Sequence, residues 1–199
     1  PTPLAGTWRY RIETALPPLM PPRPPEGVTP QNEPAVLYNA MIHPLVPYGI
    51  AGAIWYQGES NTGRARQYQR LLPTMIESWR TSWGYDFPFG IVQLANFKQR
   101  KDTPTDSDWA RLREAQFLTA RNDSLAGLAV AIDVGEADDI HPKNKQEVGR
   151  RLGLWALGTV YGADIVYSGP LYDSIRITGD TALIAFTHVG EGLEAPHGE

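Results

Sequence analysis

Three apolar runs constrain the fold of this chain more than any other feature. They cover residues 50–56, 87–95 and 125–134, and each run ends in polar residues. None shows the strict alternation of a strand with one face in water, which favours strands buried on both faces of a parallel sheet. For the first run, periodicity alone leaves a short buried helix open. Segments with helical spacing separate the runs, so the middle of the chain predicts strand–helix units.

The remaining segments complete an α/β prediction. Helical spacing predicts four helices, at residues 35–43, at 64–80 with a kink or restart at Pro73, from a cap at Asp108, and from Pro142 to Gly162. Short β-type runs follow at residues 165–167, 174–178 and 181–186, with Gly179-Asp180 as a hairpin turn. A half-buried strand at 4–13 and an extended proline-rich connection at 17–25 precede them. We expect three layers, a mostly parallel sheet and a small antiparallel piece at the C-terminus.

Composition excludes several classes of function. The 199 residues fit one domain, and the net charge of -4 without a basic run argues against a nucleic-acid partner. No apolar run approaches the roughly 18 residues of a membrane span. The chain has no Cys, which removes disulfides and thiolate chemistry. The first residue is Pro1 rather than Met, so we expect that the chain does not begin where its gene does.

The first apolar run opens into a dense polar loop, Gln57 to Asn61. Ligands of open α/β sheets bind beyond the carboxyl ends of the strands, so a site is expected at this loop. The alternative is a turn that is polar without being functional. Ser60 is a tempting nucleophile here, but Thr62 stands where the G-x-S-x-G pattern requires its second Gly.

The third run leads to Asp138-x-x-His141, which could be an oriented general base. A carboxylate that accepts one imidazole N–H fixes the tautomer and leaves the other nitrogen free to take a proton. One alternative is an exposed His beside capping residues, with Asn144 and Glu147 as the capping pair. Another is a metal site. That site would use Asp138, Asp139, His141 and Glu59, but no H-E-x-x-H or similar spacing supports it.

Three blocks together resemble the sialate O-acetylesterases, which belong to the SGNH-hydrolase superfamily together with acetylxylan esterases. The blocks are residues 37–45 (LYNAMIHPL), 55–61 (WYQGESN) and 139–145 (DIHPKNK), and the shorter pieces at 79–80, 88–94 and 113–116 agree. The resemblance implies a serine esterase on a flavodoxin-like sheet that removes acetyl groups from carbohydrates such as sialic acid or acetylated xylan. It implies no cofactor and no metal, and it suggests a secreted, periplasmic or lysosomal setting.

The same resemblance assigns roles to residues. His141 corresponds to the general base, and Asp138 to the residue that orients it. Gln57 and Gly58 fall in the block that helps to form the oxyanion hole, and Glu59 positions this loop, with proton transfer by Glu59 as the alternative.

One block of the family has no counterpart between residues 1 and 50, namely the Gly-Gln-Ser-Asn block that carries the nucleophile at the end of the first strand. The chain therefore resembles a C-terminal part of such an enzyme, one domain over residues 1–199 that lacks its first strand and continues beyond Glu199. We expect an N-terminal fragment of the same protein to supply the Ser and to pair with the strand at residues 50–56. The alternatives are a non-catalytic carbohydrate-binding domain, to which six Trp and nine Tyr are suited, and a hydrolase that uses Ser60.

Overall fold

The computed structural model describes residues 33–194, and both the predicted strand at 4–13 and the proline-rich connection at 17–25 lie outside the described residues. The chain divides into two compact units after Leu45. In the first unit, the helix predicted at residues 35–43 appears as a π-helical turn, Tyr38–Ile42, that continues into a 3-10 turn, His43–Leu45. The second unit holds the sheet and the residues of the candidate site.

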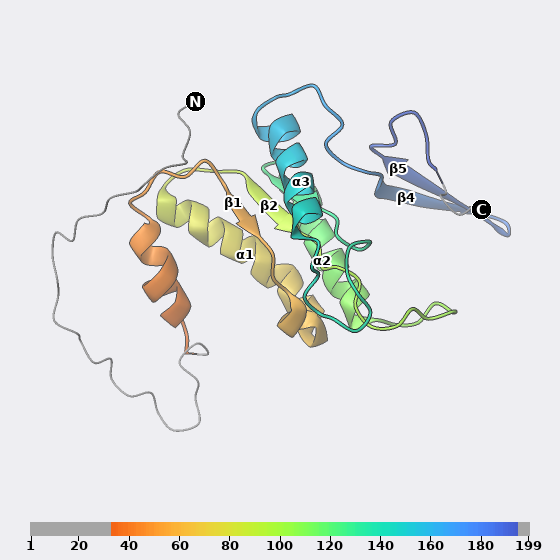
Figure 1. Ribbon diagram of the computed structural model, residues 1–199, viewed down its shortest axis with the longest axis horizontal. Coiled ribbons are helices and arrows are strands. Elements are labelled where there is room, and N and C mark those ends of the chain that lie inside the picture. Colours follow the sequence, from red (N-terminus) through yellow and green to blue (C-terminus); the bar gives the residue numbers. More distant parts are fainter. Residues whose placement is uncertain (1–32, 195–199) are drawn as a thin grey trace. The chain divides into compact units, whose positions relative to one another are not determined.

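The three apolar runs form a parallel sheet, as predicted (Figure 1). Its strands are β1 (Ala53–Trp55), β2 (Phe89–Val92) and β3 (Ala126–Ala129), in the order β1-β2-β3. Ala53 pairs with Phe89, and Phe89 pairs with Ala126. All four residues of β2 are buried.

The expectation that the first strand is buried on both faces is wrong. Ile54, in the middle of β1, is 71% exposed. The physical reason is that β1 lies at the edge of the sheet, with β2 as its one strand neighbour among residues 33–194, and that α3 packs mainly on β2 and β3. An apolar strand edge of this kind is open to pairing with a further strand.

Helices form at three of the predicted places, with corrected boundaries. They are α1 (Ala65–Trp83), α2 (Asp108–Asn122) and α3 (Lys145–Trp155). The side chain of Ser107, rather than Asp108, caps α2 by accepting the N–H of Ala110. Pro73 does not interrupt α1. Pro73 lies on the exposed side, where water can satisfy the carbonyl that the missing N–H leaves free.

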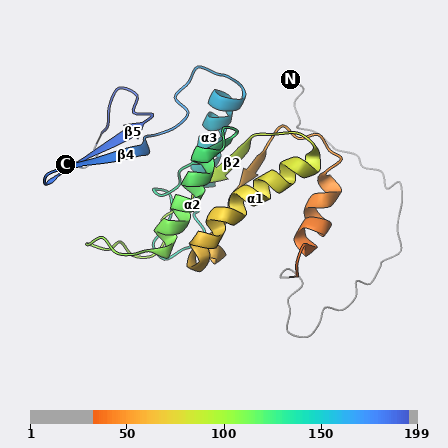
Figure 2. The same ribbon diagram turned by 180° about the vertical axis from the view of Figure 1, so that it is seen from behind.

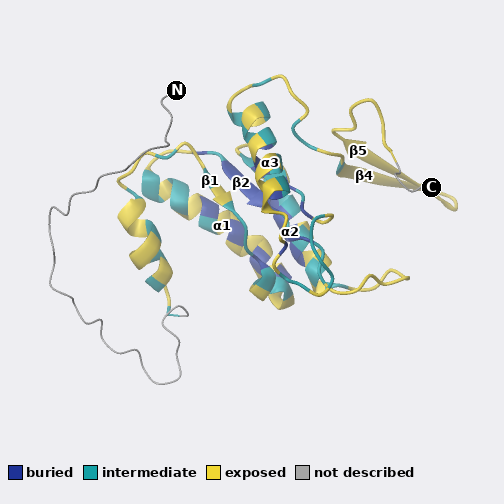
Figure 3. Ribbon diagram, viewed as in Figure 1, coloured by how far each residue is buried: buried dark blue, intermediate teal, exposed yellow. Residues whose placement is uncertain are grey.

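Helices cover both faces of the sheet, which confirms the three layers. On one face, Phe89 and Ile91 of β2 form a core with the inward residues of α1 and α2, among them Leu72 and Leu112. On the other face, Val92 packs with residues of β3 and α3. Figure 1 views the sheet from the side of α3, and Figure 2 from the side of α1 and α2. The buried residues concentrate between these layers (Figure 3).

Two strand glycines allow α3 to approach the sheet closely. A Cβ atom built on Gly127 would lie 1.8 Å from the indole Nε1 of Trp155. One on Gly90 would lie 2.8 Å from Cζ3 of the same ring. Trp155 is 8% exposed, so its indole occupies the space that side chains on β2 and β3 would otherwise need.

The predicted antiparallel piece is a hairpin of β4 (Leu171–Thr178) and β5 (Thr181–Thr187). Gly179 lies in its turn with a φ of 62°, a conformation that glycine adopts without strain.

Among the residues described, no helix is both long and apolar enough to cross a membrane.

Candidate active site

The loop after β1 is anchored through one backbone carbonyl. The carbonyl of Gln57 accepts hydrogen bonds from the hydroxyl of Tyr68 (3.1 Å) and from Nε2 of Gln116 (3.0 Å). The side-chain amide of Gln57 donates to Oδ1 of Asn61 at 2.7 Å. Gly58 is buried and has a φ of 148°, and a 3-10 helix (Glu59–Arg64) follows it. The predicted oxyanion block is therefore a tightly held turn.

Gln116 of α2 holds the same turn from the core, and sequence analysis gave it no role of its own. It is fully buried, and its amide also donates to the carbonyl of Val92 (3.3 Å) and accepts the N–H of Leu94 (2.9 Å). It thus joins the exits of β1 and β2. The available signal was a side-chain amide at an inward position of the helix, because buried polar side chains need partners.

The loops after β2 and β3 are joined in the same way. The N–H of Gly135 donates to Oδ1 of Asn96 at 2.7 Å, and the N–H of Lys98 donates to the carbonyl of Ala137 at 2.8 Å. A Cβ atom on Gly135 would lie 2.3 Å from the carbonyl oxygen of Asn96. These contacts fix the segment that leads to His141.

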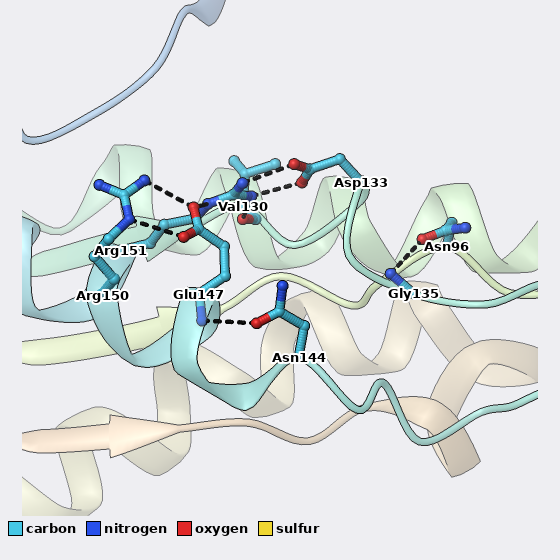
Figure 4. Close-up of polar contacts among 8 residues, drawn as sticks. All are labelled: Asn96, Val130, Asp133, Gly135, Asn144, Glu147, Arg150 and Arg151. Atoms are coloured by element: carbon cyan, nitrogen blue, oxygen red, sulfur yellow. Dashed lines mark hydrogen bonds and ion pairs between the residues drawn. The ribbon is translucent and has the colours of Figure 1, made fainter.

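Arg151 of α3 clamps this segment from the other side (Figure 4). Its guanidinium donates to the carbonyl of Val130 (2.6 Å), pairs with both carboxylate oxygens of Asp133, and donates to Glu147 (2.8 Å). Arg150 also holds Glu147, through two hydrogen bonds. These hydrogen bonds lower the pKa of Glu147 to about 2, and the hydrogen bonds from Arg151 lower the pKa of Asp133.

His141 is the exposed end of this clamped segment. Its side chain is 88% exposed, and its Nδ1 lies 3.7 Å from Oδ1 of Asp139. The same oxygen accepts the backbone N–H of His141 at 2.8 Å. Within the described residues, Asp138 makes no hydrogen bond to His141. The structure thus brings Asp139, rather than Asp138, next to the imidazole in this arrangement.

The start of α3 connects the two candidate loops. The side chain of Asn144 caps the helix by accepting the N–H of Glu147 at 3.1 Å, as the capping alternative anticipated. The ammonium group of Lys145 lies over the ring of Tyr56, 4.7 Å from its centroid. Because Tyr56 directly follows β1, this contact brings the Gln57–Gly58 turn and the His141 segment to one end of the sheet.

The structure also describes the remaining candidates from the sequence. Ser60 is exposed, and within the described part of the chain its hydroxyl contacts neither His141 nor a carboxylate. No group of three or more His, Asp or Glu side chains among residues 33–194 is arranged to hold a metal ion. Glu59 begins the 3-10 helix, and its carbonyl accepts the hydroxyl of Thr62 at 3.0 Å.

Comparisons with known proteins identify the family of the chain. Residues 30–156 match the family described as "Carbohydrate esterase, sialic acid-specific acetylesterase". The chain is 35% identical to the sialate O-acetylesterase of Mus musculus and 34% identical to that of Homo sapiens. Each match covers 83% of this chain, and 34% and 35% of those proteins, respectively. The chain thus spans about a third of the length of these relatives.

A solved structure gives the same result. The crystal structure of a carbohydrate acetylesterase from Xanthomonas citri superimposes with a TM-score of 0.70 at 45% sequence identity. The match covers 75% of this chain and 35% of that one. The chain therefore belongs to the sialic acid-specific acetylesterase family of carbohydrate esterases.

Proposed function

We propose that this chain is the base-bearing part of a carbohydrate O-acetylesterase that works by a Ser-His-Asp mechanism. One observation carries the proposal: the ammonium group of Lys145, four residues after His141, lies over the ring of Tyr56, which directly precedes the Gln57–Gly58 turn. His141 presents an imidazole that is 88% exposed. Relatives named sialate O-acetylesterase and carbohydrate acetylesterase support acetylated sugars as the substrate.

The nucleophile in this proposal comes from an N-terminal segment of the same protein that adds a strand beside β1. The open edge of β1 and the 71% exposure of Ile54 support such a neighbour. A second observation concerns Tyr56, whose hydroxyl is buried and has no hydrogen-bond partner within residues 33–194. Buried hydroxyls are almost always paired, so a segment packed on β1 is expected to supply its partner.

The reaction follows from these positions. The Ser Oγ attacks the carbonyl carbon of the acetyl ester while His141 takes the hydroxyl proton. The resulting oxyanion is stabilised by N–H donors of the Gln57–Gly58 turn. As the intermediate collapses, His141 protonates the departing sugar oxygen, and an acetyl-serine forms. Water, deprotonated by His141, then releases acetate. A carboxylate at the Asp138–Asp139 pair keeps the imidazole in the right tautomer.

Labelling of the full-length protein with a fluorophosphonate, followed by peptide mass analysis, tests this proposal. We expect one phosphonylated Ser, located in the N-terminal segment, and a His141→Ala variant that reacts several orders of magnitude more slowly. His188→Ala is the matched control, because this exposed His pairs with Tyr167 and Thr187 on and beside the hairpin. An adduct on Ser60 would instead make Ser60 the nucleophile. Glycan binding without any adduct would support a non-catalytic domain.

A further inference from the structure

We propose that Gln116, together with Tyr68, is a positioning residue that aims the N–H of Gly58 at the acetyl oxyanion. The inference rests on the proposed esterase function and adds to it two side chains that touch no substrate. Gln116 comes from α2 and Tyr68 from α1, and both reach the same carbonyl, that of Gln57.

The argument begins with the geometry of one peptide unit. The carbonyl of Gln57 and the N–H of Gly58 belong to the same planar group, and in a trans peptide they point in opposite directions. Two donors, at 3.0 and 3.1 Å, hold that carbonyl toward the core formed by α1 and α2. The N–H of Gly58 therefore points away from this core. It has no acceptor within residues 33–194, so it remains available to a ligand.

The turn also requires glycine at its second position. The φ of 148° at Gly58 is in a region that side chains other than that of glycine rarely allow. A Cβ atom there would lie 2.5 Å from Cδ2 of Leu112 and 3.4 Å from Nε2 of Gln116. Gly58 is thus pressed against α2, which lets Gln116 reach the carbonyl.

Burial argues that Gln116 acts by orientation. Its side chain is fully buried, and three hydrogen bonds tie it to backbone groups at the exits of β1 and β2. A preorganised donor stabilises an oxyanion only if it stays fixed while the charge develops. An amide that holds two strand exits at once provides this rigidity.

The experiment compares Tyr68→Phe and Gln116→Met in the full-length enzyme, with Thr119→Val as the matched control. Thr119 is buried in the same helix, and its hydroxyl bonds within that helix to the carbonyl of Ala115. For hydrolysis of an aryl acetate, we expect kcat to fall about 10- to 100-fold in Gln116→Met and less in Tyr68→Phe. KM should stay unchanged, and Thr119→Val should keep the kcat of the parent. Tyr68→Phe removes one oxygen atom, so it carries the test if Gln116→Met fails to fold.

A second readout separates orientation from stability. The readout is the NMR signal of the Gly58 amide proton. In the parent treated with a fluorophosphonate this signal should shift downfield, because the amide donates a hydrogen bond to the phosphonyl oxygen in the oxyanion position. This shift should be lost in Gln116→Met and kept in Thr119→Val. Active variants with unchanged kcat, or a parent adduct that leaves the Gly58 amide unshifted, would overturn this inference alone. A parent that neither hydrolyses the ester nor forms the adduct would refute the proposed function, and the inference with it.

Discussion

The packing of α3 on the sheet predicts that one substitution, Gly→Ala, has opposite effects at different glycines. In the sheet, Gly127 and Gly90 both face the ring of Trp155. In α3 itself, Gly153 has no atom within 4 Å of the position that a Cβ would occupy. Gly127→Ala should destabilise the protein, Gly90→Ala should have a small effect, and Gly153→Ala should stabilise it.

The distances set the size of each effect. At Gly127 the new methyl group would lie 1.8 Å from Nε1 and 2.1 Å from Cε2 of an indole that is 8% exposed. Ordinary contacts need about 3.5–4 Å, so the whole ring must move, at a cost of about 1–3 kcal/mol. At Gly90 the separations are 2.8 Å from the edge of the same ring and 3.0 Å from a Leu152 methyl, so a much smaller displacement than at Gly127 restores ordinary contact. The lower entropy of unfolded Ala offsets that cost, leaving a net change of about 0–1 kcal/mol. In α3, Gly153→Ala should raise the free energy of unfolding by about 0.5–1 kcal/mol, because Ala has the higher helix propensity.

Equilibrium unfolding in urea measures these changes, provided that the slope with denaturant is the same in all variants. The combined variant Gly127→Ala/Trp155→Leu supplies the cross-check. Because a smaller side chain removes the overlap, the double variant should lose less stability than the sum of the single changes. Additive effects, or a Gly127→Ala variant as stable as the parent, would refute the idea that the indole occupies the space above Gly127.

Three further predictions concern the site. Arg150 and Arg151 lower the pKa of Glu147 to about 2 from its ordinary 4.5, so their contribution to stability is complete above about pH 4.5 and is lost as the pH falls toward 2. The Tm should drop as the pH falls through this window, and it should drop less steeply in Arg151→Met than in the parent. Equal slopes of Tm against pH in the two proteins would contradict a stabilising role for the pairing of Arg151 with Glu147. The family resemblance gives the orienting role to Asp138, although Asp139 is the carboxylate beside the imidazole. On that assignment Asp138→Asn should lower kcat by about 10⁴-fold through the wrong imidazole tautomer, and Asp139→Asn by less; a reversed ranking would transfer the orienting role to Asp139. Gln57→Ala should lower kcat for an aryl acetate with little change in KM; a change confined to KM would make Gln57 a sugar-binding residue.

The sequence predicted the layers well because they depend on local periodicity. Apolar runs without alternation marked all three strands, and three- to four-residue spacing marked α1 and α2. The prediction that β1 is buried on both faces was wrong. Periodicity shows which residues of a strand are apolar, but it carries no information on how many neighbours the strand has. The cap of α2 was misplaced by one residue because Ser107 and Asp108 can both cap a helix.

The sequence predicted which loops form the candidate site, but it did not predict the side-chain contacts that hold them. The polar residues after β1 and β3 were identified from the sequence, since ligand sites of such sheets follow the strand ends. The contacts of Gln116 and Arg151 were missed because their partners are remote in the sequence. Gln116 bonds to Gln57, 59 residues away, and Arg151 bonds to Asp133, 18 residues away. The choice between Asp138 and Asp139 depends on loop geometry, which adjacent residue types do not encode.

The two sheets of this protein differ in how far apart in the sequence their paired residues lie, and this difference sets an order of folding. In the hairpin, Thr178 pairs with Thr181 across a two-residue turn, so β4 and β5 can meet within about 1–10 μs. In the parallel sheet, Ala53 must find Phe89 and Phe89 must find Ala126, with a helix formed in each connection. Such distant pairings form slowly. We therefore expect the hairpin to form early. The carboxyl end of the parallel sheet, where the loop with His141 lies, should be completed among the last steps, after α3 has docked on the sheet.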